Sequence, residues 1–358
     1  MSNLTSLIGS VIATDPSFAQ GRVLATASAL PDARHAVKST RNAAVAVATA
    51  PNKQILQLNA LPVTITAARY TNALSSANPK GDLAAAYALR LLADPIPDFT
   101  HYYNPSPSST DQVYGAVIQS AAVQSTSSFA SLVLAGAQAS YSRNAFAQLD
   151  GTPGTWHLVE ASPFDWWDAS LTDRFQPASV DFANSSSSDD SPFLSIGTQA
   201  DDKFSWQVVD SGGKVTQVPL SSTLANVSFR FLRVTLTRSW LNFTLFQTNG
   251  WNLPGQSSGF ISSGNNQTND GIFPLLPTGF VLGTEVAIDA DAWSSSDQQV
   301  IAQAQAGKVG LSVGPFAIAP PPLPATKPLV KLQGTTLSSA ALQIIGWISA
   351  LVPPSPTA

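Results

Sequence analysis

The chain has 358 residues, of which 44% are hydrophobic and only 11% are charged, and it contains no Cys. The absence of Cys excludes disulfides, thiolate catalysis and cysteine-ligated metals. The 18 Lys and Arg against 22 Asp and Glu form no basic surface for a nucleic acid, while 17 Phe, 8 Trp and 6 Tyr predict a folded chain.

The N-terminal 21 residues do not have the pattern of a secretory signal peptide. They begin without a basic region, and Asp15 and Pro16 interrupt their apolar run. No segment of the sequence reaches the roughly 18 uncharged apolar residues that a membrane-spanning helix needs. We therefore expect the protein to be cytoplasmic or to be released by a non-classical route.

The first predicted elements mix strand and helix patterns. Residues 32–50 fit either a helix or an alternating strand, whereas residues 53–70 alternate as a strand does. The clearest helix is GDLAAAYALRLLADP at 81–95, with Asp82 as its N-cap and Asp94-Pro95 at its end. Because apolar residues occupy every face of this helix, we expect it to lie inside the core.

A second helical region follows a proline-rich loop at 94–109 and extends to about Gln148. Ser109 and Gln112 have the spacing of a capping box at its start. The Ser-Thr-Ser-Ser run at 125–128 is expected to interrupt this region.

From about residue 155 the pattern predicts antiparallel strands separated by turns rich in Gly, Pro and Asn. A hairpin is expected at 203–220, with its turn at residues 210–213. The stretch 223–238 predicts one long strand that is covered on both sides, because apolar residues occupy both of its faces. These residues are Phe229 and Phe231 on one face, and Leu232, Val234 and Leu236 on the other. Further strands are expected at 271–290 and 308–319.

Three irregular segments complete the second half of the chain. Ser239 is predicted to cap a short helix that carries Trp240, Phe243 and Phe246. The loop at 254–272 is long, and such loops are often functional, so it is predicted as an exposed contact surface. Residues 320–328 form a proline-rich spacer, and the uncharged stretch at 337–351 is expected to be a docked helix.

These elements predict an α+β fold in three parts. Residues 1–148 are expected to be helix-rich with some short strands. Residues 149–319 are expected to form a mainly antiparallel, β-sandwich-like domain. Residues 320–358 are expected to be the proline-rich linker and the docked C-terminal helix.

The most unusual stretch is LDGTPGTWHLVEASPFDWWDAS at 149–170. Its rare residues suggest chemistry, but its turns favour a structural corner in which Trp rings are buried and Asp side chains cap turns. On a strand, His157 and Glu160 face opposite sides, so we expect no metal site there. Carboxylates beside Trp rings also occur in glycoside hydrolases. The weak catalytic candidates are Glu160, Asp165 and Asp168, and the candidate ligand-binding side chains are Trp156, Trp166 and Trp167.

No other pattern points to catalysis. The sequence has only three His, and it lacks a nucleophile elbow, a phosphate-binding glycine loop and the zinc motif H-E-x-x-H. We expect no cofactor. Arg230, Arg233 and Arg238 lie in or beside the long predicted strand, where we expect them to pair with buried Asp or to stack on aromatic rings. Binding of an anionic ligand by these arginines is the alternative.

The composition and the missing catalytic patterns predict a non-enzymatic structural or self-assembling protein. Such a protein would act through neutral, low-charge surfaces, and its expected partner is a second copy of itself. Two alternatives stay open. One is a membrane-active, toxin-like protein that uses the C-terminal helix or the loop at 254–272. The other is a glycan-binding protein or glycoside hydrolase that uses the stretch at 149–170.

Overall fold

The structure is a computed structural model. It describes residues 4–13, 54–71, 82–99, 102–147, 155–184, 193, 205–320 and 330–357. The element predicted at 32–50 lies outside the described residues, as does almost all of the proline-rich spacer predicted at 320–328.

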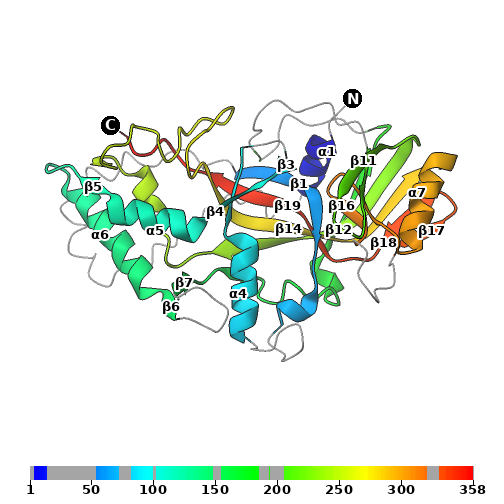
Figure 1. Cartoon of the computed structure of the whole chain (residues 1–358), viewed down its shortest axis with the longest axis horizontal. Coiled ribbons are helices and arrows are strands. Elements are labelled where there is room, and N and C mark those ends of the chain that lie inside the picture. Colours follow the sequence, from blue (N-terminus) through cyan, green and yellow to red (C-terminus); the bar gives the residue numbers. More distant parts are fainter. Residues whose placement is uncertain are drawn as a thin grey trace.

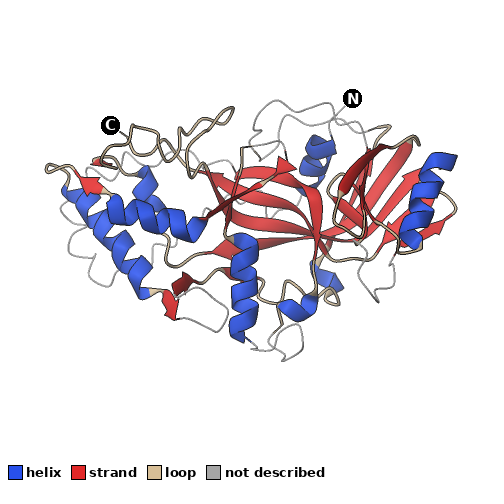
Figure 2. Ribbon diagram, in the orientation of Figure 1, coloured by secondary structure: helices blue, strands red, loops and turns tan. Residues whose placement is uncertain are grey.

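A nine-stranded, mostly antiparallel sheet runs through the middle of the molecule (Figures 1 and 2). Its axis is the pair β12 (Leu224–Thr237) and β14 (Leu275–Ala290), whose registers run along most of both strands. On the edge away from β12, the first part of β14 pairs with β19 (Gln343–Leu351), and the last part of β14 pairs with β18 (Thr336–Ser339). The other strands of this sheet are β1 (Gln54–Thr64), β3 (Tyr102–Tyr103), β8 (Glu160–Ser162), β9 (Gln176–Asp181) and β17 (Val330–Gln333).

The long strand predicted at 223–238 is confirmed as β12, and both of its faces are covered as expected. Phe229 and Phe231 are 2% exposed and pack into one hydrophobic cluster. Val234 and Leu236 belong to a different cluster on the opposite face, with Leu232 packed against it. A strand buried on both faces fixes its own register, since a slip by one residue would exchange the two apolar sets.

A second sheet of four strands packs against one face of the first. Its strands are β10 (Ser205–Val209), β11 (Val215–Pro219), β15 (Gly310–Val313) and β16 (Phe316–Ala319). The predicted hairpin is confirmed, and the Asp210 carboxylate accepts hydrogen bonds from two amides of its turn. Trp206 and Phe316 of this sheet share one cluster with Phe229 of β12. The expected mixed α and β fold with mainly antiparallel sheets is therefore confirmed, and helices are few.

Helices cover the sheets and extend the molecule at one end (Figure 1). They are α1 (Leu4–Ala13), α4 (Asp82–Ala93), α5 (Thr110–Ser120), α6 (Ser128–Arg143) and α7 (Ser295–Gln305), with short 3-10 helices η2 (Ala67–Arg69), η3 (Thr172–Arg174) and η4 (Phe243–Gln247). The predicted helix at 81–95 is confirmed as α4. Its expected full burial is wrong, because Leu83 and Leu91 are 42% and 48% exposed and only the side with Ala85, Leu89 and Ala93 is buried.

The second predicted helical region is also confirmed, including its interruption, but it ends at Arg143 and not near Gln148, because residues 145–147 form the strand β6. The Ser109 hydroxyl accepts a hydrogen bond from the amide of Gln112 and so caps α5. The chain leaves the helical conformation between α5 and α6, where the short strand β5 (Ala122–Val123) pairs with β13 (Trp251–Asn252).

The predicted C-terminal helix is wrong, because residues 343–351 form the strand β19 between β1 and β14. A short apolar run has no periodicity that separates a buried helix from a buried strand. Gly346 lets β1 approach closely, since a Cβ there would lie 3.0 Å from the Gln57 carbonyl oxygen. Residues 343–351 thus lie inside the main sheet, between β1 and β14.

A smaller hydrophobic cluster holds the helical end together. Tyr114 of α5 and Leu134 of α6 pack with Trp240, Trp251 and Val352, so residues from distant parts of the chain share this core.

The helix predicted to start at Ser239 is instead the 3-10 helix η4, whose N-cap is Asn242. The remaining short strands pair as β2 (Pro95–Pro97) with β4 (Pro105–Ser109), and β6 (Ala145–Ala147) with β7 (Thr155–His157). The division of the chain at 149 and 320 stays a prediction.

Candidate functional site

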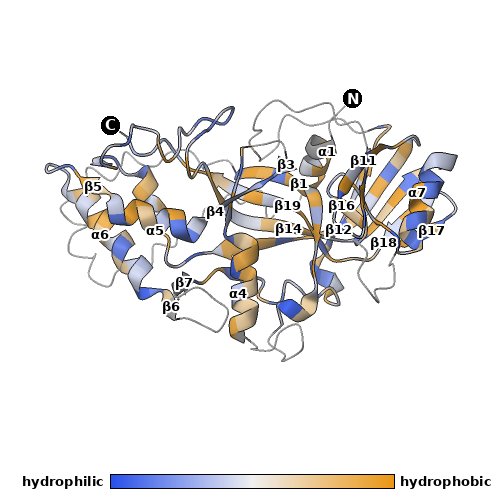
Figure 3. Ribbon diagram, in the orientation of Figure 1, coloured by the Kyte–Doolittle hydropathy of each residue, from blue (hydrophilic) through white to orange (hydrophobic). Residues whose placement is uncertain are grey.

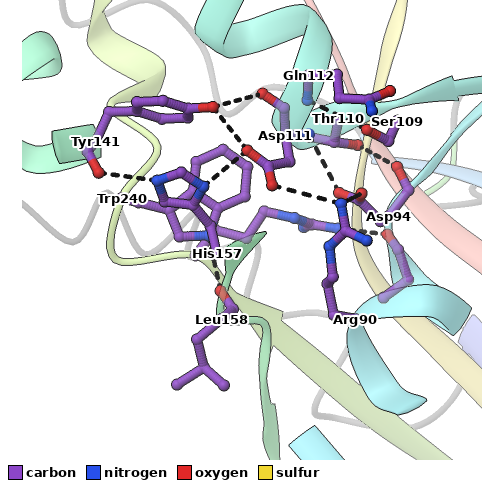
Figure 4. Close-up of polar contacts among 12 residues, drawn as sticks. Arg90, Asp94, Ser109, Thr110, Asp111, Gln112, Tyr141, His157, Leu158 and Trp240 are labelled. Carbon is purple, nitrogen blue, oxygen red and sulfur yellow. Dashed lines mark hydrogen bonds and ion pairs between the residues drawn. The ribbon is translucent and has the colours of Figure 1, made fainter. Parts of the chain in front are cut away.

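The most concentrated chemistry in the described residues is a buried ionic cluster at the junction of the helical end and the main sheet (Figure 4). It consists of Arg90 on α4, Asp94 just after α4, Asp111 on α5, Tyr141 on α6 and His157 on β7. Apart from Tyr141, these residues are 7% exposed or less. Charges so deeply buried are stable only when they are paired and hydrogen-bonded.

Asp111 is at the centre of this cluster. Its Oδ1 atom lies 2.8 Å from His157 Nδ1 and accepts a 2.8 Å hydrogen bond from the Tyr141 hydroxyl. Its Oδ2 atom lies 3.4 Å from Arg90 Nη2, which pairs more closely with Asp94 Oδ2 at 2.9 Å. Asp94 Oδ1 in turn accepts the backbone N–H of Asp111. One carboxylate thus links three helices and a strand.

The two carboxylates of the cluster have opposite pKa shifts. Burial raises the pKa of Asp111, but the hydrogen bonds from His157 and Tyr141 and the nearby positive charges outweigh it and leave the pKa lowered. For Asp94 burial dominates, and its pKa is raised despite the charges of Arg90 and Arg238. Burial and the adjacent Asp111 carboxylate raise the pKa of Tyr141, so its hydroxyl stays a donor.

His157 has no free ring nitrogen for a substrate. Its Nε2 atom lies 2.8 Å from the backbone carbonyl oxygen of Tyr141, and its ring is 2% exposed. The ring stacks on that of Tyr141, with centroids 3.9 Å apart. The Trp240 ring flanks it, and the Trp240 indole N–H donates to the Leu158 carbonyl oxygen. This geometry fits a structural cross-link between elements rather than a general base.

The lowered pKa of Asp111 predicts acid sensitivity that depends on this residue. Its ionised form contributes stability above the ordinary pKa of 3.8, and this contribution is lost as the pH falls through the lowered folded-state pKa. We expect the free energy of unfolding of the wild type to exceed that of Asp111→Asn at pH 6, and this difference to shrink steadily below pH 3.8. Urea titrations of both proteins across this range measure it. A difference that is constant with pH would contradict the assigned role.

In the described part of the predicted stretch, residues 155–170, the Trp side chains mainly pack inside the protein. Trp156 is fully buried and packs edge-on against Tyr87. Trp166 is 2% exposed and lies between Tyr70 and Phe280. These two rings therefore offer no surface to a ligand, which argues against their prediction as ligand-binding side chains, whereas the half-buried Trp167 stays a prediction.

Of the weak catalytic candidates, Asp165 and Asp168 are joined by a backbone hydrogen bond, from the Asp168 amide to the Asp165 carbonyl oxygen. Glu160 is exposed on β8, and Asp165 forms an ion pair with Arg174. Asp168 accepts hydrogen bonds from the amide and hydroxyl of Ser170, as expected of a turn-capping Asp. Ser170 and Arg174 are also the main causes of the lowered pKa values of Asp168 and Asp165, respectively. Both carboxylates are thus engaged structurally.

The three arginines in or beside the long strand each donate hydrogen bonds to neutral oxygen acceptors, and Arg238 also interacts with the charge of the buried Asp94, as expected. Arg230 donates to the carbonyl oxygens of Thr172 and Phe175, and Arg233 to the side chain of Gln54. Arg238 donates to the carbonyl oxygens of Ala93 and Pro277. Burial lowers the pKa of Arg238 to about 10, while the charge of Asp94 acts against this shift.

A shallow, open depression of about 390 Å³ lies over β9, β12 and β14. It contains Glu285, a non-glycine residue with a positive φ of 50°, at a bulge in β14. Arg230 also lines this depression, and its guanidinium already donates hydrogen bonds to the backbone of η3 and of the residue after it. The lining residues are Pro177, Ala178, Ser179, Ser228, Phe229, Arg230 and Glu285.

Sequence reasoning singled out His157 but missed its partners. Arg90 and Asp94 are four residues apart at the end of a predicted helix, which is a recognisable ion-pair spacing. Nothing in the sequence indicated that Asp111 and Tyr141 would meet His157, because tertiary packing alone brings their elements together.

Within the described parts of the chain, no three His, Asp or Glu side chains converge as metal ligands. None of the helices described is both long and apolar enough to cross a lipid bilayer.

Models of known protein families, curated proteins and solved structures give no significant match to this chain.

Proposed function

We propose that the protein is a non-enzymatic structural protein that associates with a second copy of itself through the outer face of α6. The observation that carries the proposal is the exposure of two large apolar side chains on this helix. Phe129 is 56% exposed and Leu132 is 55% exposed. Hydrophobic residues gather in this N-terminal half of α6 (Figure 3).

These side chains begin a stripe along the helix. Phe129, Leu132, Gly136 and Ala139 are spaced three, four and three residues apart, as in the seam of paired helices. The buried residues of α6 lie on the opposite side, at Ala130, Val133, Leu134 and Ala137. No charged residue interrupts the stripe before Arg143, so little charge would be desolvated by a partner.

The stripe is self-complementary in an antiparallel arrangement. Its large side chains lie in the first half of the helix and its small residues in the second half. A Cβ at Gly136 would have no neighbour within 4 Å, so there is open space beside the helix at this point. In a two-fold pair, Phe129 and Leu132 of each copy would pack over Gly136 and Ala139 of the other.

The other apolar segments that could form a contact surface are buried within the protein itself. Leu7, Ile8 and Ile12 of α1 are buried in the main cluster, and β19 lies within the large sheet. The membrane-active alternative therefore lacks the free C-terminal helix on which it depended. The predicted contact loop at 254–272 is partly tied down, since Ser262 and Ile261 bond to the backbone near Ser355. The large sheet and the four-stranded sheet packed against it would form the sandwich-like body of this structural protein.

Sedimentation velocity tests the proposal. We expect the wild type to form a dimer at about 10 µM and Leu132→Glu to remain monomeric, because an ionised Glu would be desolvated in the contact. A second variant, Gly136→Leu, fills the open space and is expected to weaken the dimer while favouring the helix itself.

The matched control is Leu91→Glu, which changes a leucine of similar exposure on α4. It is expected to leave the dimer intact. A monomeric wild type at about 100 µM would contradict the proposal, as would equal loss of association in the two Glu variants.

A further inference from the structure

The strand β11, Val215–Pro219, is an open edge of the four-stranded sheet. It pairs with β10 on one side, and no other strand among the described residues pairs with its opposite side. All of its residues except the half-buried Val218 are exposed. An open edge presents unpaired backbone N–H and C=O groups, with which another strand can pair.

The other edges of the two large sheets are short, buried or guarded by charge or proline, as the edges of natural sheets usually are. The strand β17 carries Lys331, β9 contains Pro177 and Asp181, and β3 and β8 have only two and three residues. At the opposite edge of the small sheet, β16 is buried along its whole length. By contrast, β11 has five residues, no charge, and a proline only at its end.

The turn before β11 determines which of its backbone groups face outward. The Asp210 amide donates to the Lys214 carbonyl oxygen, so the backbone groups of Lys214 point toward β10. Successive residues of an antiparallel strand point these groups toward opposite edges. Those of Val215, Gln217 and Pro219 therefore point away from β10. The position of Pro219 agrees with this direction, because proline has no N–H and is tolerated where this group would face outward.

We propose that β11 is a self-association surface, at which the β11 strands of two copies pair antiparallel about a two-fold axis at Gln217. At the axis, the N–H of each Gln217 donates to the carbonyl oxygen of the other. Beside the axis, the Val215 N–H of each copy donates to the Pro219 carbonyl oxygen of the other, which requires no N–H from proline. In this register all five residues of each strand lie opposite residues of the other, and the two four-stranded sheets become one.

The side chains of an identical strand suit this edge. Val215 faces Pro219 of the other copy, and on the opposite face of the sheet Thr216 faces Val218, so apolar and β-branched side chains meet. Val215 is 41% exposed, and Val218 already packs against the main hydrophobic cluster, so the pair covers apolar surface and extends this core. Residues 215–219 carry no charge that would be desolvated. A second copy therefore satisfies both the backbone and the side chains of the edge.

This surface is separate from the proposed contact at α6 and uses none of its residues. In the molecule, β11 lies toward the end opposite to α6 (Figure 1). A chain that uses both surfaces is joined to one copy at each end, so the copies form a linear series instead of a closed dimer. Because β11 contributes only five residues, its pairing is weaker than a standard interface and forms mainly at high protein concentration.

Disulfide trapping tests the pairing, since the chain has no Cys of its own. Gln217→Cys is placed in the Leu132→Glu variant, which removes the contact at α6, and is oxidised with copper phenanthroline at about 50 µM. The control is Gln333→Cys, an exposed Gln of the edge strand β17. We expect the Gln217→Cys dimer to form about tenfold faster, because the paired Cα atoms lie within disulfide range. Equal rates at the two positions would overturn the proposal.

The register is tested by mixing two further variants. Val215→Cys and Pro219→Cys are expected to form a mixed disulfide, identified by mass, faster than either variant forms a disulfide with itself. Faster formation of either self-disulfide would overturn the axis at Gln217. Adding Gln217→Pro to both variants removes an outward N–H but none that pairs with β10, so we expect the mixed disulfide to form about tenfold more slowly. An unchanged rate would contradict the backbone pairing. If Gln217→Pro disrupts the hairpin, the two Cys experiments still decide.

The same Gln217→Cys disulfide without Leu132→Glu separates the two surfaces. If both surfaces associate, oxidation gives species larger than a dimer, and a reductant returns them to α6 dimers. Covalent dimers that do not associate further would show that β11 pairs and α6 does not. Failure of the disulfide while the reduced protein stays dimeric would overturn the pairing of β11 and leave the contact at α6 intact.

Discussion

Replacing Asp297 by Ala is expected to lower the free energy of unfolding by about 3–5 kcal/mol, because several buried donors then lose their acceptor. The Asp297 carboxylate lies at the start of α7 and is 1% exposed. It accepts the Trp206 indole N–H at 2.7 Å and the backbone N–H groups of Ser221 and Ser222. These three donors are fixed by the backbone or by packing and cannot turn toward another acceptor.

Urea unfolding followed by Trp fluorescence measures this effect. Asp297→Asn keeps one acceptor oxygen and is expected to cost about half as much as the Ala variant. Asp270→Ala is the matched control, since Asp270 is exposed, and we expect a change within about 0.5 kcal/mol. Equal stabilities of Asp297→Ala and Asp270→Ala would show that this carboxylate does not hold α7 to the sheet.

Asp111→Asn is expected to lower the free energy of unfolding at neutral pH by about 3–5 kcal/mol. The substitution preserves shape but leaves the positive charge of Arg90 with Asp94 as its only remaining carboxylate within the cluster, and it removes the carboxylate beside His157 Nδ1. A buried cation without a counter-charge is costly, and the cost appears as lost stability.

A double-mutant cycle isolates the direct interaction. If Asp111 and His157 interact, Asp111→Asn combined with His157→Gln should be less harmful than the sum of the single changes, by about 1–3 kcal/mol. Asp270→Asn is the exposed control for the charge change. Strict additivity of the two buried substitutions would contradict the interaction between Asp111 and His157.

Local sequence patterns were sufficient to predict those elements whose structure is determined by residues close together in the chain. The hairpin turn at 210–213, the cap at Ser109 and the two-sided pattern of β12 all appear as expected. Each depends on short-range chemistry: turn residues, a hydroxyl three residues before an amide, and alternation with a period of two.

Patterns misled where a segment is apolar throughout. Residues 343–351 contain only two polar side chains, Gln343 and Ser349, which are too few to define a period, so the pairing with β1 and β14 on either side makes them a strand. The outer face of α6 is uncharged as far as Arg143, so its sequence did not show which of its sides would be buried. The tertiary structure leaves Phe129 and Leu132 of this face without cover from the described residues.

The sequence by itself determined that this is a cysteine-free, weakly charged, folded chain without a recognisable catalytic motif, and that its second half is mainly β. Only the tertiary structure decided that Trp156 and Trp166 are enclosed and that His157 meets Asp111 and Tyr141. The physical reason is that composition and spacing act through local geometry. The charge, burial and partners of a side chain are instead set by elements that are distant in sequence and are joined by the collapse of a common hydrophobic core.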